Sequence, residues 1–252
     1  MTTVICEKVP NVDVDRDINS QIKNAPDGDV LVKNVAGHRY IGNGTSGKAI
    51  TIEGTPGNAL GAYLNGSTII VNGNAQDAVG DTMNCGSIVI HGNAGDTVGY
   101  GMRDGKIFIK GNAGYRSGIH MKEYQDKVPL VVIGGKTGNF LGEYQAGGTI
   151  IVLGLDNVNA PSGVPAVGGF CATGQHGGRI YIRSDVLPEF LPVQVICADA
   201  DDSDKEFIKP FITEFVEHFS DLGQTVDGLL AAHFFKLTPN SKSPYKQLYV
   251  NN

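Results

Sequence analysis

Aliphatic residues recur in pairs about every 19 positions between residues 28 and 184. The two members of a pair are separated by one residue, and mostly polar or variable residues lie between and beside them. This period-two alternation places both aliphatic side chains on one face of a short β-strand. The eight pairs are Val30/Val32, Ile50/Ile52, Ile69/Val71, Ile88/Ile90, Ile107/Ile109, Val131/Ile133, Ile150/Val152 and Ile180/Ile182. We expect eight strands that bury this face and leave the opposite face wetter.

Glycine marks the same point of successive repeats. Gly54, Gly73, Gly92 and Gly111 are each 19 residues apart. A fixed period of about this length is typical of a solenoid, in which every repeat stacks on the previous one. No segment between the strands has the pattern of a crossover helix. The sequence therefore predicts an all-β solenoid, a single right-handed parallel β-helix, roughly 35–40 Å long because its strands lie ~4.8 Å apart.

The turns contain small and conformationally permissive residues. In the Gly-Asn-Ala-Gly corners at 92–95 and 111–114, Asn and Gly tolerate a positive φ and Ala is small enough to point inward. Asn74, Asn93 and Asn112 are expected to stack and share side-chain hydrogen bonds as a ladder.

Two repeats are longer than the others. The spacing from Gly111 to Gly135 is 24 residues and that from Gly154 to Ser184 is 30, so these repeats carry insertions. The first insertion holds HMKEYQDK (120–127), and the second spans 157–176. Insertions into a solenoid become side loops, often on a binding face.

The first insertion and the neighbouring segment NFLGEYQAGG (139–148) give the candidate interface. Both segments carry charged and aromatic side chains, and loops on a rigid scaffold often carry function. The alternative is a solvated loop held by its own salt bridges. The candidate residues are His120, Lys122, Glu123, Tyr124, Glu143 and Tyr144.

The N-terminal end of the solenoid is predicted to be covered by a helix. Residues 15–24 place Ile18 and Ile22 on one face, and an uncovered end would expose unpaired backbone groups. The expected organisation is a cap segment at 1–27, the β-helix domain at 28–184, and a helical C-terminal extension with a tail at 185–252.

A second amphipathic helix is predicted in the extension, where Ser203 and Glu206 have the spacing of a capping box. Pro210 is expected to bend or divide this helix and Gly223 to end it. Its stripe of aromatic residues is expected to pack on the solenoid, with a docking surface as the alternative. The stripe comprises Phe207, Phe211, Phe215 and Phe219. The tail at 234–252 is expected to lie extended along the body.

Composition narrows the class of protein. The chain has 252 residues, a formal net charge of -6 and 35 glycines, about twice the usual share. The acidic balance argues against a nucleic-acid-binding surface. The N-terminus lacks an apolar run of signal-peptide length, and no stretch approaches a membrane span. Four separated cysteines are typical of buried thiols in a reducing compartment. We expect a soluble, cytoplasmic protein.

Motifs for independent catalysis are missing from the sequence. The glycine-rich strings are followed by strands and not by helix starts, so they do not match a dinucleotide fingerprint, and there is no phosphate-binding loop motif. No serine has the flanking glycines of a nucleophile elbow. The six histidines do not pair at metal-ligand spacing. His91 is expected to face outward.

Several segments are recognisable beyond their period: GHRYIGNG, GTPGNALGAYLNG, VNGNAQDAVGDTM, GYRSGIHMKEY, VIGGKTGNFLGEYQAGGTIIVLGL and GQHGGRIYIR. Together they resemble the GXGXG domain of glutamate synthase, the C-terminal β-helix domain (domain 3) of the large subunit. The resemblance covers roughly residues 15–184 and includes the irregular insertions. The same β-helix occurs in one subunit of formylmethanofuran dehydrogenase, but IHMKEY and FLGEYQAGG favour glutamate synthase.

The resemblance implies a stand-alone subunit. In glutamate synthase the domain adjoins a glutaminase-type amidotransferase with an N-terminal cysteine nucleophile and a barrel that carries FMN and an iron–sulfur cluster. In this chain Cys6 is not N-terminal, and no cysteine cluster could hold iron and sulfur. The family's β-helix is architectural and offers no catalytic residue to carry over. The extension at 185–252 resembles the tails of stand-alone versions.

The expected function is that of a non-catalytic scaffold in a glutamate synthase-type complex, which moves the glutamine amide nitrogen to 2-oxoglutarate or a related acceptor. No catalytic, cofactor-binding or metal-binding residues are expected in this chain. FMN and the iron–sulfur cluster are expected in a partner synthase subunit, next to an amidotransferase subunit. The alternatives are the β-helical subunit of a molybdenum- or tungsten-dependent formylmethanofuran dehydrogenase and an independent homo-oligomeric β-helix that binds a small ligand.

Overall fold

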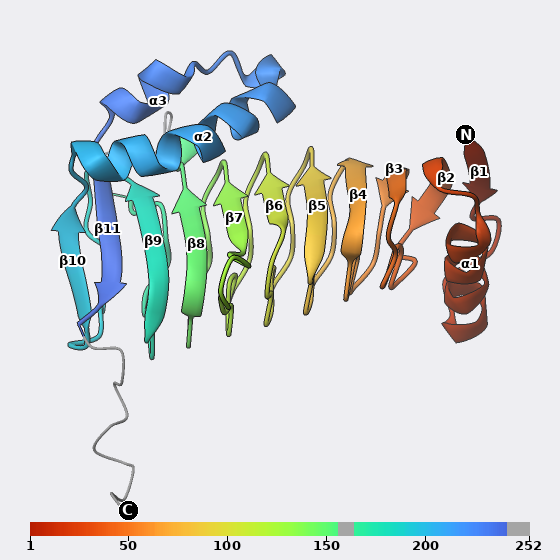
Figure 1. The fold of residues 1–252 in the computed structure, drawn as a ribbon, viewed down its shortest axis with the longest axis horizontal. Helices are drawn as coiled ribbons and strands as arrows, with labels where there is room; N and C mark the ends of the chain where they lie inside the picture. Colours follow the sequence, from red (N-terminus) through yellow and green to blue (C-terminus); the bar gives the residue numbers. More distant parts are fainter. Residues whose placement is uncertain (156–163, 241–252) are drawn as a thin grey trace, which may run out of the picture.

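The computed structural model describes residues 1–155 and 164–240, which form one 11-stranded, largely parallel sheet with few helices (Figure 1). Successive strands lie side by side in sequence order from β1 to β9, all parallel, and β11 and β10 complete the sheet antiparallel to their neighbours. The strands are β1 (Thr2–Ile5), β2 (Gly28–Ala36), β3 (Lys48–Thr55), β4 (Asn65–Asn72), β5 (Cys85–Ile90), β6 (Lys106–Ile109), β7 (Leu130–Ile133), β8 (Ala146–Val152), β9 (Gly177–Arg183), β10 (Val195–Asp199) and β11 (Phe234–Pro239).

The eight predicted aliphatic pairs are confirmed, and they stack in two columns. In the first column each residue is the pairing partner of the next, from Val30 through Ile50, Ile69, Ile88, Ile107, Val131 and Ile150 to Ile180. All of these side chains are buried. Because burial of one such aliphatic side chain contributes about 1.5–3 kcal/mol, the two columns provide much of the driving force for folding.

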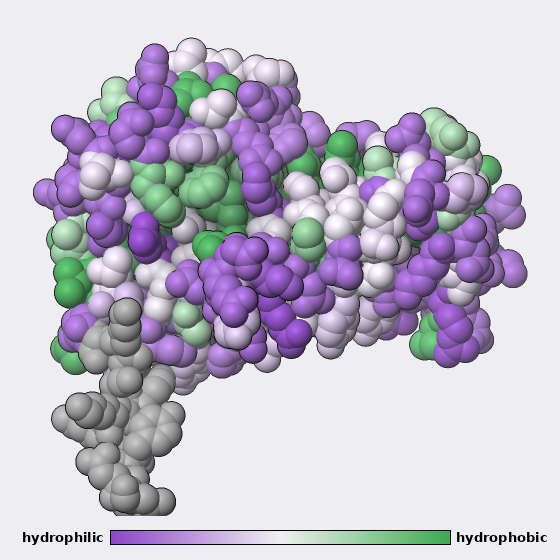
Figure 2. Space-filling model, in the orientation of Figure 1, coloured by the Kyte–Doolittle hydropathy of each residue, from purple (hydrophilic) through white to green (hydrophobic). Residues whose placement is uncertain are grey.

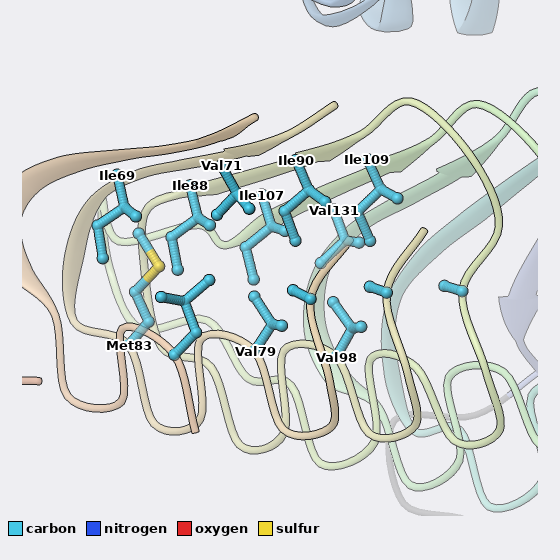
Figure 3. Close-up of a cluster of buried hydrophobic side chains, with 14 of the residues drawn as sticks. Ile69, Val71, Val79, Met83, Ile88, Ile90, Val98, Ile107, Ile109 and Val131 are labelled. Carbon is cyan, nitrogen blue, oxygen red and sulfur yellow. The ribbon is translucent and has the colours of Figure 1, made fainter. Parts of the chain in front are cut away.

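The segments that return from one strand to the next close the other side of this core. Val79 and Val98 come from return segments and point toward the strand isoleucines (Figure 3). The return segments also bond to one another: the amides of Gly61, Gly80 and Gly99 donate to carbonyls of the preceding repeat at 2.7–2.9 Å. Gly80 needs to be glycine, because its φ is +68° and a Cβ would lie 2.5 Å from Ile107 Cδ1.

The asparagine ladder is confirmed, but its bonds run from backbone to side chain. The Asn93 amide donates to Asn74 Oδ1 at 2.8 Å, and the Asn112 amide donates to Asn93 Oδ1 at 2.7 Å. A second ladder was not predicted: the Asp96 amide donates to Asp77 Oδ1 at 2.9 Å, and the Tyr115 amide to Asp96 Oδ1 at 2.8 Å. Both ladders supply acceptors to turn amides that no strand partner reaches.

The expectation of a wetter outer face is wrong for β5–β9. There the second face is also apolar, and helix α2 (Asp202–His218) lies across it (Figure 1). The residues of this outer core include Val89, Phe108, Val132, Ile151 and Tyr181 from the sheet, and Ile208, Ile212 and Phe215 from the helix. The strand sequences show this second apolar set, but alternation alone does not reveal which face a distant helix covers.

Helix α2 differs in detail from its prediction. The capping box is formed by Asp201 and Asp204 and not by Ser203 and Glu206: Asp204 donates its amide to Asp201 Oδ1 at 2.9 Å. Pro210 does not divide the helix, because buried residues on both sides of it pack on the sheet and offset a cost of about 3 kcal/mol. The helix ends at His218.

The segment after α2 continues around the outer face. Gly223, with φ +63°, ends the short 3-10 helix η2 (Ser220–Leu222) instead of α2. Helix α3 (Val226–Ala231) follows, with Thr225 as its N-cap residue. Lys110 on the sheet forms an ion pair with Asp221, which holds this segment against the strands.

The phenylalanine stripe packs on the sheet as expected, but unevenly. Phe215 and Phe219 are buried, and Phe219 meets the outward-facing His91 edge-on at 5.2 Å. Phe207 remains 37% exposed, with the Arg179 guanidinium 4.6 Å from its ring centroid. Hydrophobic side chains stay visible below α2, where the helix does not cover the whole outer face (Figure 2).

Helix α1 lies at the N-terminal end of the sheet, and two antiparallel strands complete the other end. The predicted N-terminal helix is present as α1 (Val12–Asn24), which starts earlier than expected because Asn11 caps it, and Ile18 and Ile22 are buried. Strand β1 before it was not predicted. At the other end β11 extends the sheet, so residues 234–239 are extended as expected, whereas the tail at 241–252 lies outside the described residues. The domain boundaries after 27 and 184 stay predictions.

Truncation of Phe215 should detach the helical extension. Phe215→Ala is expected to lower the free energy of unfolding by about 3–5 kcal/mol, because it leaves a cavity between α2 and the sheet. The half-exposed Phe207→Ala is the matched control and should cost less. Chemical denaturation followed by circular dichroism measures both, and equal losses would contradict this account.

His218 should make stability depend on pH. Burial beside Phe108 lowers the pKa of His218 below its ordinary value of 6.5. The unfolded chain then binds more protons between that lowered pKa and about 6.5, so stability should fall as pH falls through this window. His218→Gln should remove this component. The pKa of His233 is raised, mainly by its bond to the Ser184 carbonyl, so His233 changes stability with pH in the opposite direction. The contribution of His218 is therefore measured as the difference between the denaturation curves of the wild type and the His218→Gln variant across this pH window.

Candidate functional site

The first insertion interlocks with the neighbouring turn. Glu123 Oε2 accepts a hydrogen bond from the Gly148 amide at 2.8 Å. A Cβ on Gly147 would overlap the backbone nitrogen and the side chain of Glu123. The segments IHMKEY and GEYQAGG therefore depend on one another: the glycine pair makes room for the insertion, and the insertion supplies an acceptor to the buried Gly148 amide.

The insertion is closed by its own backbone. The Tyr124 amide donates to the Lys127 carbonyl at 3.0 Å, and the Lys127 amide donates back to Tyr124 at 3.1 Å. Gln125, with φ +58°, lies in the tight turn between them. Tyr124 is 70% exposed, so the turn holds an aromatic ring out into solvent.

His120 and Tyr144 come together as an exposed stack. Their rings are nearly parallel, with centroids 5.2 Å apart and an interplanar angle of 11°. Tyr100, one repeat earlier, meets His120 edge-on at 5.8 Å. The backbone explains the contact: His120 donates its amide to the Glu143 carbonyl, so residues 120 and 144 occupy equivalent positions in adjacent turns.

Glu143 turns back to Arg116 of the preceding repeat. Its carboxylate is mostly buried and accepts from Arg116 Nε at 2.9 Å. The Arg116 guanidinium also lies over the Phe140 ring, 4.7 Å from its centroid. Glu143 thus positions Arg116.

Lys122 and Tyr124 line a shallow hollow of about 220 Å³. The other lining residues are Asn84, Arg103 and Lys127.

A second aromatic stack was not predicted from the sequence. Phe140, Phe170 and Phe190 stack in sequence, with centroids 5.2 and 5.1 Å apart. Phe170 is 43% exposed and Phe190 67%. The signal was present, because NFLGEYQAGG and GFCATGQHGG align as one turn in two successive repeats and place Phe140 and Phe170 at the same position.

The aromatic residues in these stacks have positive φ, and the turns explain why. His120, Tyr144, Phe140 and Phe170 have φ between 53° and 63°. Ala59 and Ala78 occupy the position of Phe140 in earlier repeats and have the same backbone, with φ of 62° and 57°. The positive φ is therefore a general property of this turn position, and only the aromatic side chains distinguish the later repeats.

The interior behind the turns that carry Tyr144 and Phe170 contains buried polar side chains. Gln145 is fully buried and donates to the Gly147 and Gly148 carbonyls at 3.1 Å, and Gln175 donates to Gln145 Oε1 at 3.1 Å. Met83, Met102 and Met121 precede them in the same column. Gln145 thus bonds both carbonyls of the glycine pair and, supported by Gln175, fixes the turn that receives the insertion.

Metal ligands and cysteines do not form a further site in the part of the chain that the structure describes. Residues 1–155 and 164–240 contain no group of three His, Cys, Asp or Glu side chains placed to hold a metal ion. The cysteines are free; Cys6 and Cys171 are buried, but Cys85 is exposed, contrary to expectation. Burial raises the pKa of Cys6 to about 11. Among the described helices, none has the length and apolar character needed to cross a bilayer.

Gly147→Ala should displace the insertion. The added methyl group would overlap Glu123, so we expect a loss of about 1–3 kcal/mol in the free energy of unfolding and faster proteolysis within 120–127. Gly73→Ala is the matched control, because its Cβ would approach Gly54 O only to 3.2 Å. Limited proteolysis with mass spectrometry locates the cleavage. Unchanged cleavage in the first variant would rule out the interlocking.

Comparisons with known proteins agree with this architecture. The family model described as GXGXG motif matches residues 6–239. The uncharacterized protein MJ1350 of Methanocaldococcus jannaschii is 45% identical over 223 residues, which cover 88% of this chain and 85% of that protein.

A solved structure shows the same fold. A chain of the formyltransferase/hydrolase complex (FhcABCD) from Methylorubrum extorquens, crystallised with methylofuran, superposes with a TM-score of 0.61. The match covers 84% of this chain and 73% of that chain at 20% identity, so it bears on the fold alone. Because the family model matches almost the whole length of this chain, the chain belongs to the GXGXG motif family.

Proposed function

We propose that this protein is a non-catalytic structural subunit of a multi-subunit complex. Its repeats form a right-handed parallel β-helix that holds other subunits in place, and the catalytic residues and cofactors reside in those subunits. The observation that carries the proposal is the match to a chain that is itself part of an assembly, combined with membership of the GXGXG motif family.

The geometry of the turn edge supports a scaffold role. The turns hold out two aromatic stacks and Tyr124, and the insertion that carries Tyr124 is bonded to the neighbouring turn through Glu123. Exposed aromatic and arginine side chains on a rigid support are typical of the anchors of protein interfaces. We assign His120, Lys122, Tyr124 and Tyr144 to this interface, with Glu123 and Glu143 as positioning residues.

The first candidate assembly is of the formyltransferase/hydrolase type. The structural match supports it, and it corresponds to the formylmethanofuran dehydrogenase alternative that follows from the sequence. In such an assembly this chain would brace the subunits that carry the formyl group.

The second candidate is a glutamate synthase-type complex. It rests on the joint presence of IHMKEY and GEYQAGG, which the structure links through Glu123 and the Gly147–Gly148 pair. The partners would then be an amidotransferase subunit and a synthase subunit that binds FMN and an iron–sulfur cluster. The comparisons support the first candidate better.

Purification of the tagged full-length chain from its native host tests the proposal. We expect it to be recovered in fixed stoichiometry with at least one different subunit, as measured by native mass spectrometry and peptide identification. Subunits that handle formyl groups would favour the first assembly; an amidotransferase with a flavin-containing subunit would favour the second. Recovery of the chain alone, or only as a homo-oligomer, would refute the scaffold role.

A further inference from the structure

The hollow beneath the insertion is built from a column of turn residues. Asn84, Arg103 and Lys122 occupy the same position in three successive repeats, because their amides donate to the carbonyls of Leu64, Met83 and Met102 at 2.8–3.0 Å. Lys127 and Tyr124 from the insertion complete the lining. We call this surface the basic hollow: Asn84, Arg103, Lys122, Tyr124 and Lys127.

The three cations of the basic hollow lack ion pairs within residues 1–155 and 164–240. Most other lysines of the sheet are paired, such as Lys106 with Glu214 and Lys236 with Asp204. The acidic residues of the insertion, Glu123 and Asp126, are not among the lining residues, and Glu123 accepts a hydrogen bond from the Gly148 amide. In a chain of net charge -6, three cationic side chains and no acidic one thus line the same hollow.

The fold keeps these charges close together. Adjacent repeats lie ~4.8 Å apart, so the side chains of Arg103 and Lys122 start from neighbouring backbone positions. The backbone hydrogen bonds between Tyr124 and Lys127 bring a third cation to the same hollow. Like charges on adjacent strands destabilise a fold. An anion bound between them relieves this repulsion, and a planar guanidinium is well suited to bind a carboxylate.

The size and surroundings of the basic hollow favour a protein ligand. Its volume of about 220 Å³ is below the usual range of small-molecule pockets, roughly 300–1,000 Å³. It lies beside the exposed Tyr124 ring and two residues along the turns from the His120–Tyr144 stack. Arginine and tyrosine at the centre of a surface are characteristic of anchor positions between proteins.

Building on the structural-subunit function argued above, we infer that the basic hollow binds a carboxylate side chain from an acidic loop of a partner subunit. Arg103, Lys122 and Lys127 contact the carboxylate, Asn84 contributes a further polar group, and Tyr124 packs against the loop. The partner surface is therefore acidic, and complex formation weakens as salt concentration rises.

Carbodiimide coupling in the native complex tests this inference. The reagent joins a lysine amine to a carboxylate in direct contact, forming an amide. The tagged full-length chain is purified from its host with bound subunits, coupled and analysed by mass spectrometry. We expect a crosslink from Lys122 or Lys127 to an aspartate or glutamate of another subunit. The triple variant Arg103→Glu, Lys122→Glu, Lys127→Glu should retain at least about tenfold less partner.

The matched control changes the same charge elsewhere. Lys8→Glu, Arg16→Glu and Lys23→Glu lie on the N-terminal segment and should leave partner retention unchanged. If partners copurify but both variants retain them equally, or the crosslinks lead to a second copy of this chain, the docking inference is wrong and the scaffold role stands. If the wild-type chain copurifies with no other subunit, the docking inference and the scaffold role are both wrong.

Discussion

The fold depends on one constraint: each buried aliphatic side chain must lie directly on its counterpart in the next repeat. A shift of one residue in any strand would turn its paired side chains from the core to the outer face. The glycine at the turn, as at Gly80, then has to leave room for the isoleucine of the following repeat. Strand register, turn conformation and side-chain size are therefore set together, and the Asn and Asp ladders fix the same register at the corner.

This constraint explains why the turns are so well suited to carry specific side chains. The backbone at positions 59, 78, 116, 140 and 170 is nearly the same, although the residues are Ala, Ala, Arg, Phe and Phe. The core does not depend on what these residues present to solvent. A sequence of this kind can change the side chains that its turns present to solvent one turn at a time while its packing stays intact.

The sequence predicted what is periodic and missed what is not. All eight strand pairs, the Asn ladder and α1 follow from residues that repeat or lie within one turn of each other. The burial of the outer face at β5–β9 and the continuity of α2 through Pro210 depend on contacts between segments about 100 residues apart, such as Lys106 with Glu214. The aromatic stripe predicted that the helix packs on the sheet, but no local pattern encodes which strands it covers.

The candidate site was predicted in part. The pairing of the insertion with NFLGEYQAGG followed from their place in consecutive repeats, and His120 and Tyr144 do meet. The sequence did not show that Glu143 turns back to Arg116, since this depends on the side-chain path at a positive-φ corner. Nor did it show the Phe140–Phe170–Phe190 stack, because Phe190 reaches it from beyond the repeats.

The antiparallel pairing of β11 with β9 has a consequence for length. Beyond β9 the sheet continues with β11, antiparallel to β9, and then with β10, antiparallel to β11, so the regular parallel series of strands ends at β9. Between β1 and β9, distance along the sheet is counted in whole repeats of ~4.8 Å each. Two side chains at equivalent positions of different repeats are therefore separated by a whole multiple of this spacing.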